Sequence, residues 1–207
     1  MHIQPLFAET DIGALHRLID AYPLATLTTL TARGLEANLL PLEIGATGSH
    51  GCLRGHVARH HALCTDAVEG AEVLAVFQGP NAYISPRWYV NGQRSGRLAP
   101  SWNYVAVQAR GRLRFIDDGA WLRTHLGALM ARQESHRAQP WSLEDTAADF
   151  VTEAAQRLIG FEIEILDLSG KRFLSQQRTE ADRRSLVHHL EREASGMARD
   201  LAALIVP

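Results

Sequence analysis

Segments rich in Thr and Leu or in apolar residues occur in the first half of the chain, and apolar and polar residues alternate strictly at 161–168; both patterns are typical of strands. The segment 24–31 is rich in Thr and Leu, and Arg33-Gly34 turns the chain into a second predicted strand. The segment 72–78 is nearly all apolar, as expected of a strand covered on both faces. The predicted strands are 24–31, 35–44, 52–56, 72–78, 82–85, 102–117 and 161–168.

Helical spacing of apolar residues is found in fewer places. Ile12, Leu15, Leu18 and Ile19 recur at helical spacing behind a predicted Thr10 cap. Further helices are predicted at about 58–68, at 119–132 and at 142–158, the last begun by a serine cap and ended by a glycine. A final helix begins near residue 179, and 91–96 is predicted to be a flexible loop.

Six predicted strands precede most of the predicted helices, with short turns between them. This order favours a β-rich α+β fold, an antiparallel barrel with surrounding helices, over a parallel doubly wound sheet. A chain of 207 residues is long enough for one well-buried core, so we expect a single domain, 1–207, that ends in a helix.

Composition is ordinary for a folded protein, with 46% hydrophobic and 21% charged residues. The net charge of −2 gives no reason to expect binding to a polyanion. The N-terminal residues do not resemble a signal peptide, and no apolar run approaches membrane-spanning length. We therefore expect a cytoplasmic protein in which Cys52 and Cys64 stay reduced.

The segment 53–61, LRGHVARHH, places Arg54, His56 and Arg59 around a predicted strand-to-helix junction. A helix N-terminus offers unpaired N–H groups, and arginine adds a planar fork of donors, so these are the parts of a phosphate site. A solvent-facing basic turn explains the same residues equally simply. A zinc site formed by His56, His60 and Cys64 at four-residue spacing is the weaker alternative, because a strand end at His56 would turn it away. We therefore expect no metal.

Aromatic and polar residues interleave at 78–89 and at 101–104. A flavin ring requires a flat apolar wall together with donors and acceptors for its pyrimidine edge, and Trp, Tyr, Asn and Gln supply both. The same aromatic residues could instead be core or interface residues. The motifs of serine hydrolases, P-loop enzymes and Rossmann dehydrogenases are absent, so a flavin would need another kind of site.

Arg110, Arg112 and Arg114 alternate along the long strand and share one face. A basic ladder could contact nucleic acid. Glu162 and Glu164 alternate in the same way on the last predicted strand, so the alternative is a cross-strand pairing of arginine with glutamate. We predict this pairing.

Four segments together resemble one family. LRGHVARH (53–60), EVLAVFQGPNAYISPRWY (72–89), PSWNYVAVQARGRLR (100–114) and KRFLSQQRTEADR (171–183) resemble the PaiB-type proteins, called FMN-binding negative transcriptional regulators. The resemblance runs in order over nearly the whole chain. It implies an antiparallel split β-barrel of the FMN-binding type found in pyridoxamine-phosphate oxidases and flavin reductases, a homodimer, and FMN sites built from both subunits.

The resemblance also implies which residues approach FMN. Asn38, Leu39 and the Arg54–Arg59 segment, His56 included, are expected near the phosphate and ribityl chain. Gln78 and Ser85 are expected near the ring, with Trp102 and Asn103 contributed by the partner subunit. The C-terminal block is expected to close the site through Lys171, Ser175, Gln176 and Arg178.

Three functions remain open. The first is an FMN-binding negative transcriptional regulator that uses or senses flavin, although no helix-turn-helix is recognisable and any DNA contact would be weak, indirect or aided by a protein partner. The second is an FMN-dependent oxidoreductase similar to flavin reductases, with His56 as a candidate acid or base. The third is a haem-binding barrel, which needs one suitably placed axial histidine among the ten in the chain.

Overall fold

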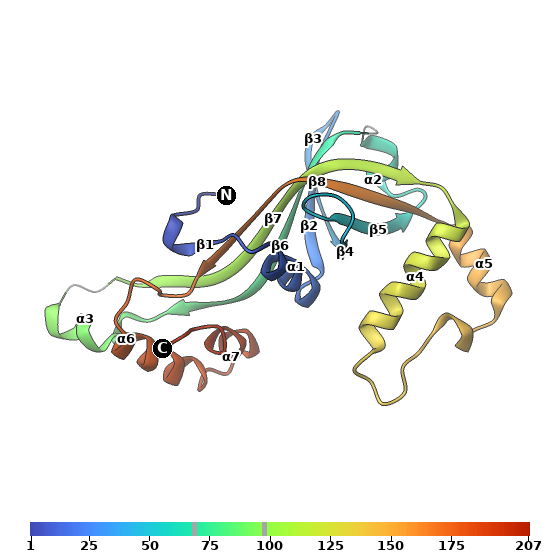
Figure 1. Cartoon of the computed structure of the whole chain (residues 1–207). Helices are drawn as coiled ribbons and strands as arrows, with labels where there is room; N and C mark the ends of the chain where they lie inside the picture. The colour runs from blue at the N-terminus through green and yellow to red at the C-terminus, as the bar shows by residue number, and fades with distance from the viewer. Residues whose placement is uncertain (68–69, 97–98) are drawn as a thin grey trace. The chain divides into compact units, whose positions relative to one another are not determined.

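The computed structural model describes residues 1–67, 70–96 and 99–207, and Figure 1 shows its elements in chain order. Within these residues the helices and strands are η1 (Pro5–Phe7), β1 (Ala8–Glu9), α1 (Ile12–Ala21), β2 (Leu24–Thr31), β3 (Gly34–Pro41), β4 (Glu43–Gly45), β5 (Cys52–Ala58), α2 (Ala62–Asp66), β6 (Glu72–Ile84), η2 (Pro86–Trp88), α3 (Val90–Ser95), β7 (Ser101–Ile116), α4 (Gly119–Glu134), η3 (Leu143–Asp145), α5 (Ala148–Gln156), β8 (Leu158–Phe173), α6 (Glu180–Leu190) and α7 (Gly196–Ala202).

Eight strands of the described residues form one sheet in the order β3-β2-β6-β7-β8-β5-β4, and β1 pairs with β8 outside this path. The pairs β2–β3, β4–β5, β5–β8 and β1–β8 are antiparallel. The prediction of a β-rich α+β fold with an antiparallel sheet is confirmed.

The chain forms two compact units, each of which draws on several separate segments. Unit 1 contains residues 1–22, 76–108 and 169–207, and unit 2 contains residues 23–75 and 109–168. The strands β6, β7 and β8 contribute residues to both units. The single domain expected from chain length stays a prediction.

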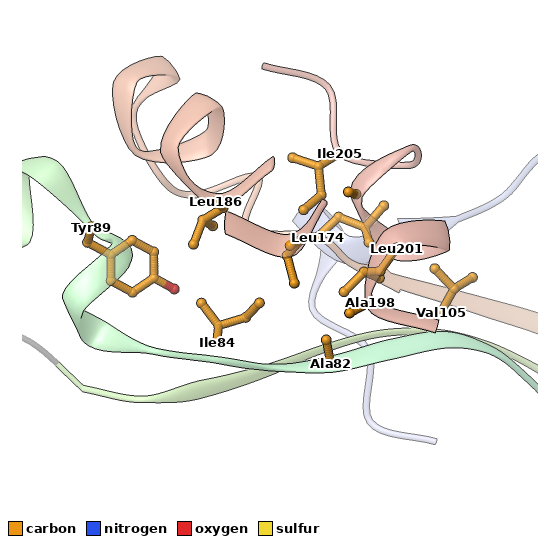
Figure 2. Close-up of a cluster of buried hydrophobic side chains, with 11 residues drawn as sticks. Ala82, Ile84, Tyr89, Val105, Leu174, Leu186, Ala198, Leu201 and Ile205 are labelled. Atoms are coloured by element: carbon orange, nitrogen blue, oxygen red, sulfur yellow. The ribbon is translucent and has the colours of Figure 1, made fainter. Parts of the chain in front are cut away.

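Unit 1 has an apolar core between its strands and the C-terminal helices, shown in Figure 2. Leu186 of α6 and Leu201 of α7 are completely buried against Ile84 of β6 and Val105 of β7. Thr179 begins α6 as a cap, because its hydroxyl accepts from the Asp182 amide. The apolar residues of α6 and α7 are therefore buried by packing against β6 and β7.

Unit 2 contains the β2–β3 hairpin and the packed strands β5 and β8. Leu53 and Phe161 are completely buried. Gly55 of β5 lies so close to Phe161 that an added Cβ would approach the ring to 2.4 Å. This close approach explains why a glycine occupies the middle of β5.

Several predicted boundaries are wrong. The α1 cap is Asp11 and not Thr10, because its carboxylate accepts from the Gly13 and Ala14 amides at 3.0 and 3.2 Å. The predicted strand 35–44 is two strands, β3 and β4, separated at Leu42, directly after a proline that cannot donate to the ladder. The predicted strands 72–78 and 82–85 are one strand, β6, which continues through Gly79 and Pro80.

The predicted helix 58–68 is the short α2, because β5 continues to Ala58. Val68, the end of that prediction, lies outside the described residues. Ser142 caps η3, whereas α5 begins later, at Ala148. Gly160 is part of β8 and does not end a helix.

The predicted loop 91–96 is wrong for a tertiary reason. Residues Val90–Ser95 form α3, although Asn91 and the glycines are typical of loops. The Asn91 amide donates to Asp182 at 3.0 Å and its side chain donates to the Thr179 hydroxyl at 2.7 Å. These two contacts with the start of α6 stabilise a helix that the local sequence does not favour.

The predicted pairing of the arginine ladder with glutamates is confirmed. The strands β7 and β8 are neighbours, and Arg114 lies 2.7 Å from the Glu162 carboxylate. Arg110 pairs instead with Glu72 of β6 at 2.8 Å. Two of the three ladder arginines are therefore paired with carboxylates within the sheet.

No helix within the described residues is both long and apolar enough to cross a membrane. Cys52 and Cys64 are both free thiols. Burial is the main cause that raises the pKa of each thiol, which keeps both thiols protonated at neutral pH.

Candidate flavin site

The residues expected to contact FMN are divided between the two units. Asn38, Leu39, Arg54, His56 and Arg59 belong to unit 2, and the remaining eight belong to unit 1. Each group has its own geometry.

Arg54 and His56 share one face of β5, since the intervening glycine points to the core. The Arg54 guanidinium lies 3.2 Å from the Glu162 carboxylate, which Arg114 also contacts. Burial alone would raise the pKa of Glu162, but the Arg114 hydrogen bond and the charges of both arginines outweigh it and lower the pKa. Glu162 is therefore ionised at neutral pH between two cations.

Arg59 follows β5 and is held by α5 and by the end of β7. Its Nε donates to the Gln156 carbonyl at 2.6 Å, and its terminal nitrogens donate to both oxygens of Asp117. The hydrogen bond that Arg59 donates to Asp117 is the main cause that raises the pKa of Arg59. A phosphate at this position would have to share or replace the carboxylate of Asp117.

The strand-to-helix junction differs from the predicted anion site. The helix α2 has five residues and is capped by His61, whose Nδ1 accepts from the Leu63 amide at 3.1 Å. His56 is a strand residue, so the helical face that a zinc site of His56, His60 and Cys64 required does not form. Among the described residues, no group of three or more His, Cys, Asp or Glu side chains is arranged to hold a metal ion.

His56 contacts residues that the sequence did not suggest. Its Nδ1 lies 3.1 Å from Nε2 of His125 in α4, and Nδ1 of His125 lies 2.9 Å from the Glu43 carboxylate. Trp121, one turn before His125, stacks on its ring with centroids 5.1 Å apart. Trp121 and His125 are four residues apart on one helix face, which is the only sequence signal that could have linked them.

On β3, Asn38 and Leu39 point to opposite faces. Asn38 faces inward, and its buried Nδ2 has no hydrogen-bond partner among the described residues. Leu39 is 67% exposed on the other face. A buried amide nitrogen without an acceptor is unfavourable, so Asn38 is prepared to donate to an oxygen that the described part of the chain does not supply.

In unit 1, Asn103 and Ser175 satisfy each other. Both are buried, and the Asn103 amide donates to the Ser175 hydroxyl at 2.9 Å. Ser175 has a φ of 63°, a left-handed conformation that is rare for serine and is stabilised here by the contact with Asn103. Both residues therefore position the turn after β8.

Trp102 presents an exposed aromatic surface on β7. Trp102 is 54% exposed, and its Nε1 donates to the side-chain Oδ1 of Asn81 at 3.0 Å. The ring of Tyr83 lies 6.2 Å away in an edge-to-face arrangement. This pair offers the flat, partly anchored wall on which a planar ring could stack.

Arg178 lies after the turn that Ser175 forms. Its guanidinium lies 4.2 Å from the centre of the Tyr89 ring, and its buried Nε has no hydrogen-bond partner among the described residues. Like Asn38, Arg178 therefore has a buried donor nitrogen that lacks an acceptor among the described residues.

The neighbours of Arg178 serve local structure. Lys171 lies over the Tyr104 ring at 5.2 Å, and Gln176 bridges the Leu174 amide and the Arg172 carbonyl. Ser85 caps η2 and Gln78 is exposed on β6.

The donor chemistry fits FMN. Its phosphate and its pyrimidine carbonyls accept hydrogen bonds, and Asn38 and Arg178 each have a buried donor without an acceptor. Trp102 supplies an exposed aromatic face for the ring. The chain therefore has the residue types that the cofactor requires.

Known structures place this fold in one class. The chain superimposes on the flavocytochrome Anf3 from Azotobacter vinelandii with a TM-score of 0.59 and 15% identity, over 83% of this chain and 72% of that one. It superimposes on an FAD and haem binding protein from Mycobacterium smegmatis with a TM-score of 0.58 and 17% identity, over 80% and 73%. The fold is an antiparallel split barrel with surrounding helices, of the flavin-binding type.

The family follows from the sequence comparisons. Residues 1–167 match the family described as "Putative FMN-binding domain", so the chain belongs to this FMN-binding family, and its cofactor is FMN. The chain is 27% identical over 205 residues to the Bacillus subtilis protein named "Protease synthase and sporulation protein PAI 2". The matched region covers 99% of this chain and 96% of that protein. The PaiB-type resemblance is confirmed.

Proposed function

We propose that this chain is a cytoplasmic, homodimeric, FMN-binding negative regulator of transcription that uses or senses flavin. The observation that carries flavin binding is the pair of buried donors, Asn38 Nδ2 and Arg178 Nε, which lack acceptors within the described residues. The regulatory role rests on the match with the Bacillus protein, which extends over nearly the whole length of both chains.

The assignment of residues to FMN follows from chemistry. In unit 1, Arg178 donates to an oxygen of the cofactor and Trp102 stacks on its ring. In unit 2, Asn38 offers the same kind of donor. Asn103, Ser175 and the remaining C-terminal residues hold the turn that presents Arg178. When bound, FMN supplies a two-electron redox centre, and the protein supplies its orientation and electrostatic surroundings.

Arg54 and Arg59 contribute positive charge near the phosphate. Each is already paired with a carboxylate, so binding requires a phosphate oxygen to join Glu162 or Asp117 as an acceptor. A guanidinium has five donors and can contact a carboxylate and a phosphate together. Both arginines can therefore keep their structural partners.

Arg54→Ala and Arg59→Ala are each expected to weaken FMN binding by roughly tenfold or more, because a charge-assisted hydrogen bond contributes about 1.5–3 kcal/mol. Riboflavin, which lacks the phosphate, should bind with nearly unchanged affinity. Titration calorimetry with both ligands measures the difference. Arg33→Ala is the matched control, since Arg33 is an exposed arginine paired with Glu36 and Asp66. Equal weakening of FMN and riboflavin would contradict the phosphate assignment.

The outer face of the β2–β3 hairpin supports a homodimer. Leu30, Leu35 and Leu39 are 63%, 76% and 67% exposed, and in the β2–β3 register Leu30 lies opposite Leu35 and Thr26 opposite Leu39. Contiguous exposed apolar residues on a sheet are unusual in a monomer and are typical of an interface. A second copy of the chain is the partner that the family resemblance implies.

Regulation by direct repression has a clear test. In a gel-shift titration at cellular salt concentration, operator DNA from a repressed promoter is expected to bind weakly, and FMN is expected to change that binding. The net charge of −2 makes strong binding to unrelated DNA unexpected. If no operator binds, with or without FMN and with a cell extract as a source of partners, repression through DNA is rejected.

An FMN-dependent oxidoreductase is the second candidate, supported by the fold shared with a flavocytochrome. Reduction of bound FMN by NADH or NADPH, followed by turnover with an electron acceptor, would identify an enzyme. A Soret band in the purified protein would indicate haem instead.

A further inference from the structure

A cluster of ionisable side chains connects α4 to the sheet of unit 2. His125 of α4 is 5% exposed and lies between His56 of β5 and Glu43 of β4. Its Nδ1 is 2.9 Å from the Glu43 carboxylate, a contact that becomes an ion pair only when both ring nitrogens of His125 carry a proton. The contact with His56, at 3.1 Å between Nδ1 and Nε2, is a hydrogen bond between two imidazole rings.

The packing around this cluster is tight and specific. Trp121 stacks on His125 with ring planes 21° apart and rests on Gly160 of β8, where an added Cβ would lie 2.2 Å from the Trp121 ring. Leu122 of the same helix is also buried. α4 is therefore attached to the sheet by one helix face, with the histidine pair at its centre.

The other charged groups near the pair are already matched. Arg54 of β5 and Arg114 of β7 both contact Glu162 of β8. Arg132 of α4 lines a cavity of about 260 Å³ together with Glu43 and Arg54. Of the described groups around the pair, these residues carry the fixed charges, and histidine is the side-chain type that ordinarily changes charge between pH 5 and 8.

The hydrogen bond between the rings limits how many protons the pair can hold. With both rings neutral, one nitrogen donates and the other accepts. A first additional proton leaves one lone pair between the rings, and Glu43 stabilises the resulting charge. A second additional proton removes that lone pair, so two N–H groups and two positive charges would face each other.

We propose that the His56–His125 pair is a proton-sensing contact that holds α4 on the sheet at neutral pH and releases it in mild acid. Release would uncover the face of β5 that carries Arg54 and His56. This inference concerns the helix contact itself and does not depend on the proposed function.

The sign of the effect follows from His56. Burial, followed by the charge of His125, lowers the pKa of His56, while Glu43 raises it to a smaller extent. In the released form His56 is solvated and regains its ordinary pKa of about 6.5. The released form therefore binds the proton more tightly, so the attachment of α4 is expected to weaken as the pH falls below about 6.5, whereas above this pH it does not depend on this proton.

Hydrogen–deuterium exchange of the full-length protein at pH 7.5, 6.0 and 5.0 tests the proposal. After correction for the intrinsic exchange rate, amides of residues 119–134 should lose up to about tenfold protection per pH unit below 6.5, for the one proton taken up. Amides of the β2–β3 hairpin should keep their protection. His56→Gln should remove this pH dependence, whereas His136→Gln, an exposed histidine beyond α4, should retain it.

Constant protection of α4 across this pH range would overturn the proposal, and so would an equal loss in His56→Gln. If His56→Gln does not fold, the wild-type protein still decides the question by nitrogen NMR of its imidazole rings. His56 must then titrate over the same pH range in which α4 loses protection. Titration of His56 with α4 unchanged would also refute it.

Discussion

Gly111→Ala is expected to lower the free energy of unfolding by about 3 kcal/mol, the upper part of the range for overpacking a core. An alanine Cβ at this position of β7 would lie 2.2 Å from the Glu164 carbonyl oxygen and 2.6 Å from the Ile163 side chain. The nearest obstacle is the backbone of β8, which cannot move without breaking the β7–β8 pairing. The substitution therefore strains the sheet itself and not one flexible side chain.

Thermal and urea unfolding of the wild type and the variant measure this loss. Gly119→Ala is the control, because no atom lies within 4 Å of an added Cβ at the start of α4. Its stability should be unchanged or higher by about 0.4–1 kcal/mol, since alanine reduces the entropy of the unfolded chain. Gly111→Ala with wild-type stability would mean that β7 and β8 are not packed as closely as described.

Leu35→Asp is expected to convert a dimer into a monomer at micromolar concentration. A symmetric interface would bury the new carboxylate twice, and an unpaired charge in an apolar interface costs several kcal/mol. The dissociation constant should therefore rise at least about a hundredfold. Sedimentation velocity of both proteins over a range of concentrations measures it.

The control for this prediction is Phe150→Asp, which places the same charge on an exposed apolar residue of α5. It should leave the association state unchanged. A wild-type protein that remains monomeric at high concentration, or a Leu35→Asp protein that remains dimeric, would reject the hairpin face as the interface.

Local patterns predicted the strands well, because a strand that buries one face has apolar side chains at every second position. In β8 the residues Phe161, Ile163 and Ile165 are buried, and this period of two was visible in the sequence. The pairing of Arg114 with Glu162 was predictable for the same reason, since both lie at alternate positions of long strands. The sequence was weakest where a contact distant in the chain overrides local preference.

α3 and the cluster around His125 illustrate the two kinds of failure. Asn91 forms part of a helix because Asp182 and Thr179, about ninety positions later, accept its hydrogen bonds. His125 could not be recognised as a partner of His56, because nothing in either segment indicates that α4 lies on β5. Asn103 was expected near the flavin ring, which stays a prediction, and its contact with Ser175 could not be read from the sequence either.

The sequence alone determined most of the strand content, the family and the cofactor. The signals for them, alternation and long motifs such as GPNAYISPRWY, consist of residues that are adjacent in the chain. Only the tertiary structure decided which polar groups are satisfied. Arg54, Arg59 and Asn103 have partners within the chain, whereas Asn38 and Arg178 each have a buried donor without one among residues 1–67, 70–96 and 99–207. The physical reason is that hydrogen-bond satisfaction depends on groups that are close in space but distant in sequence.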